Sequence, residues 1–324
     1  MNKISIGIVG YGNLGRGVEV GLKNHPDMEL TGIFSRRDPA TLETNSPTYA
    51  LDDILNFTDE IDVLILCGGS KSDIPTQGPA LVEHFNTVDA YDTHALIPKY
   101  YKKMDKIAKE KNKVAVISTG WDPGLFSMNR MLQEAILPTG DTYTFWGRGA
   151  SQGHSDAVRG VEGVKYAVQY TVPDQMMIDQ IQAGKKVDYD AKEAHSREVY
   201  IVLEEDADPA AVEKEIKEMP DYFAGYRTSV NMISEEEFKD EHQNMPHGGA
   251  VIRQGQTSDQ EMSIIDYSLT LDSNPEFTAA VNIAYARAAY KLVQEKQFGA
   301  HTVLDIPPFY LSPKSKEELI EELL

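Results

Sequence analysis

A glycine-rich turn near the start of the chain, Gly10-Tyr11-Gly12-Asn13-Leu14-Gly15, is the feature that most constrains the fold. It follows an apolar run, Ile4–Val9, that is typical of a buried strand, and it opens a helical pattern over Leu14–Lys23. In this context the first glycine permits a tight turn, the second lets a pyrophosphate approach the backbone, and the third lets helix and strand pack closely. The turn therefore predicts a dinucleotide site at a helix N-terminus.

The rest of the first third alternates short apolar runs with helical patterns. Further strands are expected at Met28–Phe34, Ile61–Cys67, Thr87–Ala90 and Val114–Ser118, and helices at Pro79–Phe85 and Pro98–Lys111. Strands separated by helices imply crossover connections between parallel strands. This region therefore predicts an α/β fold with a Rossmann-type, doubly wound parallel sheet.

After about residue 120 the strand-like segments become longer and several alternate in polarity. They are expected at Thr142–Gly147, Val164–Val172, Arg197–Leu203, Arg227–Ile233, Ala250–Gln254 and Met262–Leu271. This texture predicts a second, α+β domain built on a mainly antiparallel sheet. An alanine-rich helix is expected at Phe277–Val293, and a short terminal helix within Ser312–Leu324.

Charge and cysteine content narrow the partners and the compartment. The 324 residues include 31 Lys and Arg against 51 Asp and Glu, a net charge of −20, which disfavours nucleic acid and anionic membranes as partners. The single cysteine, Cys67, excludes an internal disulfide. Met1-Asn2-Lys3 opens no signal-peptide pattern, and apolar runs such as Val63–Cys67 are too short to span a bilayer. We expect a cytoplasmic protein.

Three residues at the end of the second predicted strand, Ser35-Arg36-Arg37, indicate the type of dinucleotide. An acid at this position would bind the ribose 2′-hydroxyl of NAD, whereas two guanidinium groups and a hydroxyl suit the 2′-phosphate of NADP. Asp38 follows directly before Pro39 and is expected to point away. We therefore predict NADP as the cofactor.

The third predicted strand ends in Cys67-Gly68-Gly69-Ser70, and in such folds this loop lies beside the nicotinamide half of the cofactor. Cys67 itself is expected to be a small buried hydrophobe, because no flanking residue obviously lowers the pKa of its thiol.

The next two predicted strand ends carry the sequences Ala90-Tyr91-Asp92-Thr93-His94 and Gly120-Trp121-Asp122-Pro123-Gly124. In open parallel sheets, ligands bind outside the carboxyl ends of the strands. Asp92 and Asp122 would therefore project toward the nicotinamide, and their natural ligand there is a cation such as an amine. The alternative is that each aspartate only caps the helix that follows it.

Further candidates lie in the second domain. Arg197 is in phase with Val199 on an alternating strand, so that it faces inward and needs an anion, either a ligand or one of the many acids of the chain. His247 lies in a glycine-rich turn, and Asn274 is either a ligand contact or a helix cap. His154 and Asp156 are too few for a metal site, and we expect no metal.

Taken together, a set of motifs resembles the meso-diaminopimelate dehydrogenase family over nearly the whole chain. They are Gly10–Gly15, Phe34–Arg37, Ser118–Gly124, Ser151–Asp156, Met219–Phe223 and Met245–Gly249. The resemblance implies reversible, NADP-dependent oxidative deamination of the D-centre of meso-2,6-diaminopimelate to L-2-amino-6-oxopimelate, ammonium and NADPH, in lysine and diaminopimelate biosynthesis. It also implies a homodimer. The domains would be an NADP-binding Rossmann domain of residues 1–120 plus about 298–324 and a substrate-binding and dimerisation domain of residues 121–297.

The resemblance further assigns roles to residues. Asp92 and Asp122 would hold the amino group of the reacting D-centre, Trp121 and Trp146 would wall the pocket, and Gln152 and Gly153 would contact polar groups of the substrate. Thr171, Arg197, His247 and Asn274 would bind the distal L-amino acid end. Cofactor contacts are expected from Gly10, Tyr11, Gly12, Asn13, Leu14, Gly15, Ser35, Arg36, Arg37, Cys67, Gly68, Ser70 and Pro123.

The residues leave two other readings and one mechanistic question open. One alternative is another NADP-dependent reductase of amino-acid pathways on the same fold, which would share the glycine turn but not the central motifs. The other is a non-catalytic NADP-sensing protein. The sequence does not distinguish an aspartate from an ordered water as the general base that removes the proton of the substrate ammonium.

Overall fold

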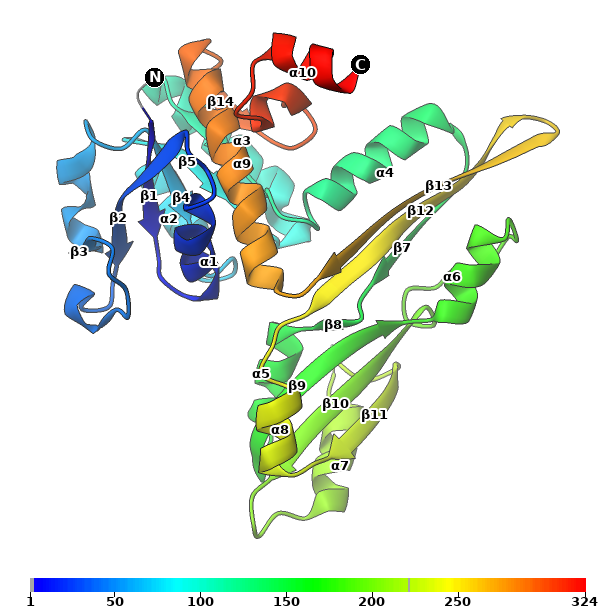
Figure 1. Cartoon of the computed structure of the whole chain (residues 1–324). Helices are drawn as coiled ribbons and strands as arrows, with labels where there is room; N and C mark the ends of the chain where they lie inside the picture. The colour runs from blue at the N-terminus through cyan, green and yellow to red at the C-terminus, as the bar shows by residue number, and fades with distance from the viewer. Residues whose placement is uncertain (1–2, 221) are drawn as a thin grey trace. The chain divides into compact units, whose positions relative to one another are not determined.

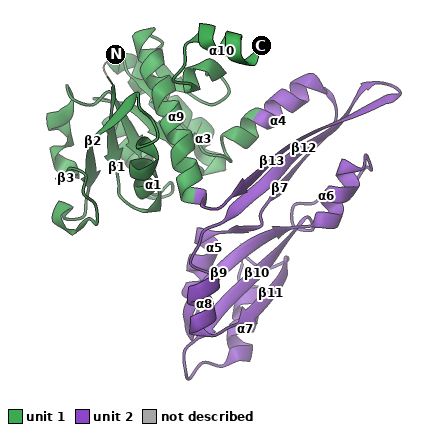
Figure 2. Ribbon diagram, viewed as in Figure 1, with its two compact units in different colours: residues 1–128, 275–324 green, residues 129–274 purple. Residues whose placement is uncertain are grey.

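The structure, a computed structural model, describes residues 3–220 and 222–324. Met1 and Asn2, on which the expectation about a signal peptide rested, and Asp221 of the Met219–Phe223 motif lie outside the described residues. The chain forms two compact units, one of Met1–Met128 and Pro275–Leu324 and the other of Asn129–Asn274 (Figures 1 and 2). No helix of the described ranges combines the length and the apolar character needed to span a membrane.

The first unit is built on a seven-stranded sheet within the described ranges, and each recorded strand pair in it is parallel. Its strands are β1 (Ile4–Val9), β2 (Met28–Ser35), β3 (Thr48–Ala50), β4 (Val63–Leu66), β5 (Asn86–Asp89), β6 (Val114–Val116) and β14 (Gly299–His301). The strand order is β14-β6-β5-β4-β1-β2-β3, which confirms the predicted doubly wound parallel sheet. The short edge strands β3 and β14 were not predicted, because three residues carry too little pattern.

Both faces of this sheet are covered by helices. Ile6 and Ile8 of β1 pack in one cluster with α1 (Asn13–Leu22) and α9 (Asn274–Gln294), whereas Leu64 of β4 packs in a second cluster with α2 (Ile74–Leu81) and α3 (Ile97–Lys111). Burial on both faces explains why these strands are continuous apolar runs rather than alternating ones.

Two predicted boundaries differ from the structure. The predicted second domain, residues 121–297, includes α9, but Ala279, Ile283 and Ala286 of this helix are fully buried in the same cluster as β1, so that α9 belongs to the first compact unit. The helix expected at Pro79–Phe85 begins earlier, at Ile74, because Pro75 fits the first helical turn, where its missing N–H costs no hydrogen bond.

The second unit holds two sheets rather than one. Its strands are β7 (Thr139–Trp146), β8 (Gly149–Ala150), β9 (Val164–Pro173), β10 (His195–Leu203), β11 (Arg227–Met232), β12 (His247–Ser258) and β13 (Glu261–Leu271). They pair in the orders β11-β10-β9-β8 and β13-β12-β7. The pairs are antiparallel except for β10 with β11, which confirms the mainly antiparallel texture.

The remaining elements are helices that connect or flank these sheets. They are α4 (Leu125–Ile136), α5 (Gln152–Arg159), α6 (Gln175–Gln182), α7 (Pro209–Glu218), α8 (Glu235–Glu241) and α10 (Lys316–Leu323), with the 3₁₀ helices η1 (Pro39–Thr41), η2 (Leu51–Phe57), η3 (His94–Leu96) and η4 (Pro308–Leu311). The helix α10 confirms the expected terminal helix, and it opens with a capping box between Ser315 and Glu318.

Candidate functional site

The predicted ligand-binding loops of the first unit all leave the same edge of its sheet. β1, β4, β5 and β6 are parallel, and each is hydrogen-bonded to a neighbour in this set. The carboxyl ends of parallel strands meet at one edge, where open α/β sheets bind their ligands. The loops at this edge are Gly10–Gly12, Cys67–Ser70, Ala90–Thr93 and Ser118–Gly124.

The glycine turn has the shape expected of a phosphate-binding turn. Gly10 adopts a φ of +91°, which favours glycine, and a Cβ added to Gly15 would collide with the carbonyl oxygen of Gly10. A Cβ added to Gly12 would meet no atom within 4 Å. The chain itself therefore requires glycine at positions 10 and 15, whereas position 12 faces open space that suits the approach of a ligand.

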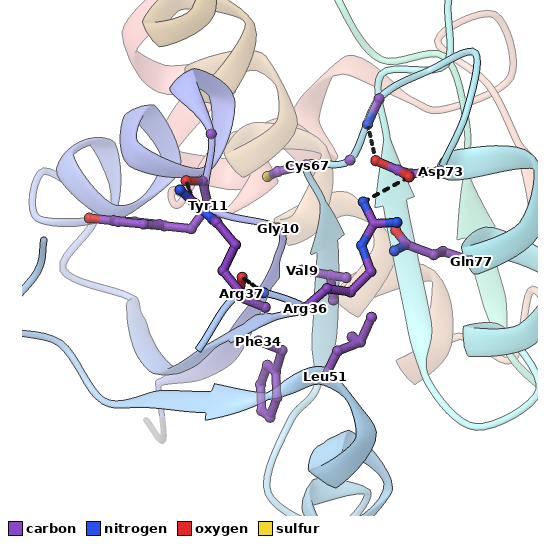
Figure 3. A pocket seen from close by; sticks show the side chains of 14 residues that line it. Val9, Gly10, Tyr11, Phe34, Arg36, Arg37, Leu51, Cys67, Asp73 and Gln77 are labelled. Carbon is purple, nitrogen blue, oxygen red and sulfur yellow. Dashed lines mark hydrogen bonds and ion pairs between the residues drawn. The ribbon is translucent and has the colours of Figure 1, made fainter. Parts of the chain in front are cut away.

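A cavity of about 340 Å³ lies beside this turn (Figure 3). It is lined by the predicted cofactor residues Gly10, Tyr11, Gly12, Ser35, Arg36, Arg37, Cys67 and Gly68. Residues that the sequence reasoning missed complete the lining, namely Val9, Phe34, Leu51, Gly69, Asp73 and Gln77. The other predicted cofactor residues, Asn13, Leu14, Gly15, Ser70 and Pro123, are not among the lining residues.

The charged groups of this cavity suit a phosphorylated nucleotide. The guanidinium group of Arg36 forms an ion pair with Asp73 at 2.9 Å, and that of Arg37 donates to the carbonyl oxygen of Tyr11 (Figure 3). Asp38 is turned away, because its carboxylate accepts the N–H of Ala40 at 3.0 Å and caps η1. The cavity thus contains two arginines where an NAD-binding protein has an acid.

A buried orphan atom also points to a ligand in this cavity. The side-chain oxygen of Gln77 is buried and has no hydrogen-bond partner among the described residues. Buried polar atoms in proteins are normally satisfied, so an unsatisfied acceptor in the wall of a cavity fits a ligand that donates hydrogen bonds. The sequence offered no signal for Gln77, because it lies within a helix.

Cys67 behaves as the sequence reasoning expected. Its thiol is buried, and burial raises the pKa of the thiol far above its usual range. A group that stays protonated is a poor nucleophile.

Asp92 lies in the loop that follows β5, and its side chain is exposed. The backbone N–H of Asp92 donates to the hydroxyl of Ser70 at 2.8 Å, which joins this loop to the one that follows β4. Thr93 is the N-cap residue of η3 and Leu96 that of α3, so that Asp92 caps neither helix. The capping alternative therefore fails for Asp92.

Asp122 lies in a tight turn after β6. The N–H of Gly120 donates to the carbonyl oxygen of Pro123 at 3.0 Å, which closes the turn around Trp121 and Asp122. Trp121 is buried and packs edge-on against Phe126, with ring centres 5.2 Å apart, whereas Asp122 is half-buried. The turn thus presents a carboxylate beside an anchored aromatic wall.

In the second unit, Arg197 is a buried cation. It is 9% exposed, donates to the hydroxyl of Thr171, and lies 4.3 Å from the ring centre of Tyr226. Its Nε is buried without a hydrogen-bond partner, and no carboxylate of the described residues forms an ion pair with it. Of the two readings left open by the sequence, a structural salt bridge is therefore not observed in the described chain, and an anionic ligand fits.

Thr171 and His247 meet at the short strand β8. Gly149 of β8 pairs with Thr171 of β9, and Thr171 pairs in turn with Arg197 of β10. A Cβ on Gly149 would collide with the ring of His247, so this imidazole lies directly on the strand. The sequence-predicted residues Thr171, Arg197 and His247 are thus brought together within one unit.

Gln152 and Asn274 are tied to the same region through Met245. The Gln152 amide lies 3.1 Å from the Met245 sulfur, and the Asn274 N–H donates to the Met245 carbonyl oxygen at 2.9 Å. Gly153 follows Gln152 in the first turn of α5, where an added Cβ would meet nothing within 4 Å.

Trp146 ends β7, and its backbone N–H donates to Nε2 of His195 at 3.0 Å. The ring centres of Trp146 and His195 lie 5.3 Å apart. His195 is two residues from Arg197 on β10, so Trp146 also belongs to this part of the second unit.

Burial disfavours the charged form of the imidazoles near Arg197. Burial lowers the pKa of His247 and His195, and burial together with the charge of Arg197 lowers the pKa of His154 to about 4. His154 bonds to the Ser151 hydroxyl at 2.8 Å, and no group of three metal-ligating side chains occurs in residues 3–220 and 222–324. Arg197 therefore carries the permanent positive charge among these residues.

Comparison with known proteins gives one consistent result. The family model described as "Diaminopimelic acid dehydrogenase C-terminal domain" matches residues 120–273. A meso-diaminopimelate D-dehydrogenase from Ureibacillus thermosphaericus is 56% identical over 326 residues, which cover 100% of both chains.

Solved structures agree with this result. The C. glutamicum DAP dehydrogenase in complex with DAP has a TM-score of 0.92 and 45% identity, and the match covers 100% of both chains. An engineered D-amino acid dehydrogenase bound to NADP+ has a TM-score of 0.87 and 44% identity, with the same coverage.

Proposed function

Because the chain belongs to the meso-diaminopimelate D-dehydrogenase family, we propose that it catalyses the reversible, NADP-dependent oxidative deamination of meso-2,6-diaminopimelate at its D-centre. The products are L-2-amino-6-oxopimelate, ammonium and NADPH, which places the reaction in lysine and diaminopimelate biosynthesis. The observation that carries the proposal is the nucleotide cavity with Arg36 and Arg37 on the same sheet edge as Asp92 and Asp122.

The nucleotide cavity would hold NADP. The turn at Gly10–Gly12 offers backbone N–H groups to the pyrophosphate, and Arg36 and Arg37 offer guanidinium groups to the 2′-phosphate. When bound, NADP supplies the chemistry of hydride transfer, since it accepts the hydride from the D-carbon. The protein must orient the substrate, place charges beside it and exclude water from the reacting groups.

Asp92 and Asp122 are proposed to take the amino group of the D-centre. Their carboxylates attract the substrate ammonium, and they stabilise the positive charge of the iminium ion that remains on the substrate after one proton and one hydride have left. Water then adds to the iminium carbon and ammonium departs. Trp121 is proposed to shield this end of the substrate, because its ring is already fixed against Phe126.

The second unit is proposed to bind the L-centre of the substrate. Arg197 and Thr171 suit a carboxylate, and Gln152, Gly153, His247 and Asn274 suit the neighbouring polar groups. Trp146 is proposed as a further wall of the substrate site. Binding of the far L-centre fixes which end of the substrate reacts, so that stereochemical selection follows from geometry.

We further propose a cytoplasmic homodimer. In the second unit, Met131, Leu132 and Ile136 of α4 are exposed by 39%, 43% and 64%, and such exposed apolar side chains suit a subunit interface. The single cysteine is consistent with a reducing compartment. Sedimentation equilibrium should give twice the chain mass, and Leu132→Glu with Ile136→Glu should shift it to the monomer.

The main test follows NADPH absorbance with meso-diaminopimelate, its LL isomer, or no substrate. We expect turnover with the meso isomer alone. No change in NADPH absorbance with any isomer, together with intact NADP binding, would favour a sensor of NADP instead. Turnover only with a cyclic imine or a semialdehyde would favour a different reductase on the same fold.

A further inference from the structure

A buried carboxylate that the proposed mechanism does not use lies at the end of β5. Asp89 is 1% exposed, and one of its oxygens accepts the N–H groups of Tyr91 at 3.0 Å and Ser118 at 3.1 Å. Its other oxygen accepts the hydroxyl of Tyr100, from α3, at 2.8 Å. One side chain therefore joins the loop after β5, the loop after β6 and a helix that covers the sheet.

The main chain of Asp89 makes a second connection to the loop after β6. Its carbonyl oxygen accepts the N–H of Thr119 at 2.9 Å, and the Thr119 hydroxyl lies 3.0 Å from the same oxygen. That hydroxyl also lies 2.5 Å from the side-chain oxygen of Asn282 in α9. The regular pairing of β5 with β6 ends at Val88 and Val116, so these bonds take over where the strands stop.

The two loops that Asp89 joins carry the proposed reacting carboxylates. Asp92 follows Tyr91 directly, and Asp122 lies four residues beyond Ser118. Ser118 has a φ of +57°, a left-handed conformation that non-glycine residues avoid unless neighbouring bonds hold it. The bond from its N–H to Asp89 is such a bond, and it sets the direction in which the chain leaves β6 toward Asp122.

We propose that Asp89 is a positioning residue for the reaction, which fixes the loops of Asp92 and Asp122 relative to each other without touching the substrate. This inference rests on the proposed roles of Asp92 and Asp122. A carboxylate suits the task because it only accepts hydrogen bonds, and three donors converge on it. Burial raises the pKa of Asp89 to about 6, so the site retains this carboxylate although burial disfavours its charged form.

Two substitutions at position 89 test whether the side chain acts by holding the two loops in place. Asp89→Asn keeps an oxygen for the N–H groups of Tyr91 and Ser118 and turns its amide toward Tyr100, so that most of the loop connection survives. Asp89→Ala removes the side-chain connection and keeps only the main-chain bonds to Thr119. Asp62 supplies a matched control, because its carboxylate accepts the N–H of Ser5 at 2.9 Å just before β4, at the amino edge of the same sheet.

The experiment measures kcat, both KM values, NADP binding by fluorescence titration, and the deuterium isotope effect on kcat with substrate labelled at the D-centre. For Asp89→Ala we expect kcat to fall by about 100-fold, since misplacement by about 1 Å costs that much, while NADP binding stays intact. The isotope effect should rise, because hydride transfer becomes rate-limiting. Asp89→Asn should recover most of kcat, and Asp62→Ala should retain kcat and the isotope effect of the parent protein.

The outcomes distinguish a failure of the role of Asp89 from a failure of the proposed roles of Asp92 and Asp122. If Asp92→Asn and Asp122→Asn lower kcat but Asp89→Ala leaves kcat and the isotope effect unchanged, the positioning role is wrong and the proposed function stands. If Asp92→Asn and Asp122→Asn are also without effect, the proposed roles of those residues fail first. Should Asp89→Ala not fold, Asp89→Glu decides, because it keeps the carboxylate but moves its oxygens by one methylene group: a lower kcat with a raised isotope effect supports the proposal, and unchanged values overturn it.

Discussion

Replacing Arg197 by methionine should lower kcat/KM for the substrate without loss of stability. The guanidinium group is 9% exposed and forms no ion pair with a carboxylate in residues 3–220 and 222–324, so within that part of the chain its buried charge has no counterion. Replacing even a buried ion pair by apolar side chains of similar volume is often neutral or stabilising by about 1–4 kcal/mol, and a buried charge without a partner has less attraction to lose. We therefore expect the free energy of unfolding of Arg197→Met to be unchanged or higher.

The cost should appear in substrate recognition instead. A hydrogen bond from a charged donor contributes about 1.5–3 kcal/mol, and Nε of Arg197 with one further nitrogen can serve one carboxylate. Allowing for desolvation, we expect a loss of about 3 kcal/mol, which corresponds to roughly 100-fold in kcat/KM for meso-diaminopimelate. The KM for NADP should not change, because the nucleotide cavity lies in the other unit.

Arg287 is the matched control, since it is also buried, at 1% exposure, but binds Asp27 at 2.6 and 2.8 Å. Removal of one partner of a buried pair costs about 3–5 kcal/mol, and the partial exposure of Asp27 places the expected loss near 3 kcal/mol. Urea unfolding and initial rates measured on both variants give the comparison. If Arg197→Met is destabilised like Arg287→Met and keeps its kcat/KM, Arg197 is a structural cation and the reasoning fails.

Four further predictions follow from the same structure. Asp92→Asn and Asp122→Asn should lower kcat more than they raise KM in initial-rate assays, whereas exposed Asp59→Asn should change neither. Arg36→Gln and Arg37→Gln should raise the KM for NADP more than that for NAD, and an equal rise for both cofactors would count against a 2′-phosphate site. Gly12→Ala should fold normally but lose NADP binding by titration calorimetry, while Gly15→Ala should lose stability because its Cβ meets the Gly10 carbonyl. Burial raises the pKa of Asp89 from 3.8 to about 6, so between these values the folded state holds a proton that the unfolded state has lost; urea midpoints of the parent protein, relative to those of Asp89→Asn, should therefore fall as the pH rises from 4 to 7.

The sequence predicted the first unit well because its signals are local. The apolar run at Ile4–Val9 and the glycine turn after it coincide with β1 and the start of α1. The domain boundary near residue 297 was missed for a physical reason. An alanine-rich helix such as α9 fits against either unit, and only the burial of Ala279 and Ile283 against β1 shows which one it joins.

The residues of the candidate site likewise fall into those that local sequence signals predict and those that they do not. Arg36, Arg37 and Asp92 follow strand ends that are visible in the sequence, so their placement at one sheet edge was predictable from topology. The positions of Tyr226 against Arg197 and of Gln77 in the nucleotide cavity could not be predicted, because they depend on tertiary packing. Asp89 did carry an overlooked signal, since an acid inside an apolar strand needs buried donors.

The return of the chain from the second unit to the first has a consequence for synthesis on the ribosome. Residues 129–274 are made before α9 and β14, which complete the first unit. Until α9 emerges, Ile6 and Ile8 on β1 lack one of the two helices, α1 and α9, that pack in their cluster. The nascent N-terminal segment therefore has part of an apolar face unshielded while the inserted unit is translated, and such transiently exposed apolar surface is what chaperones bind.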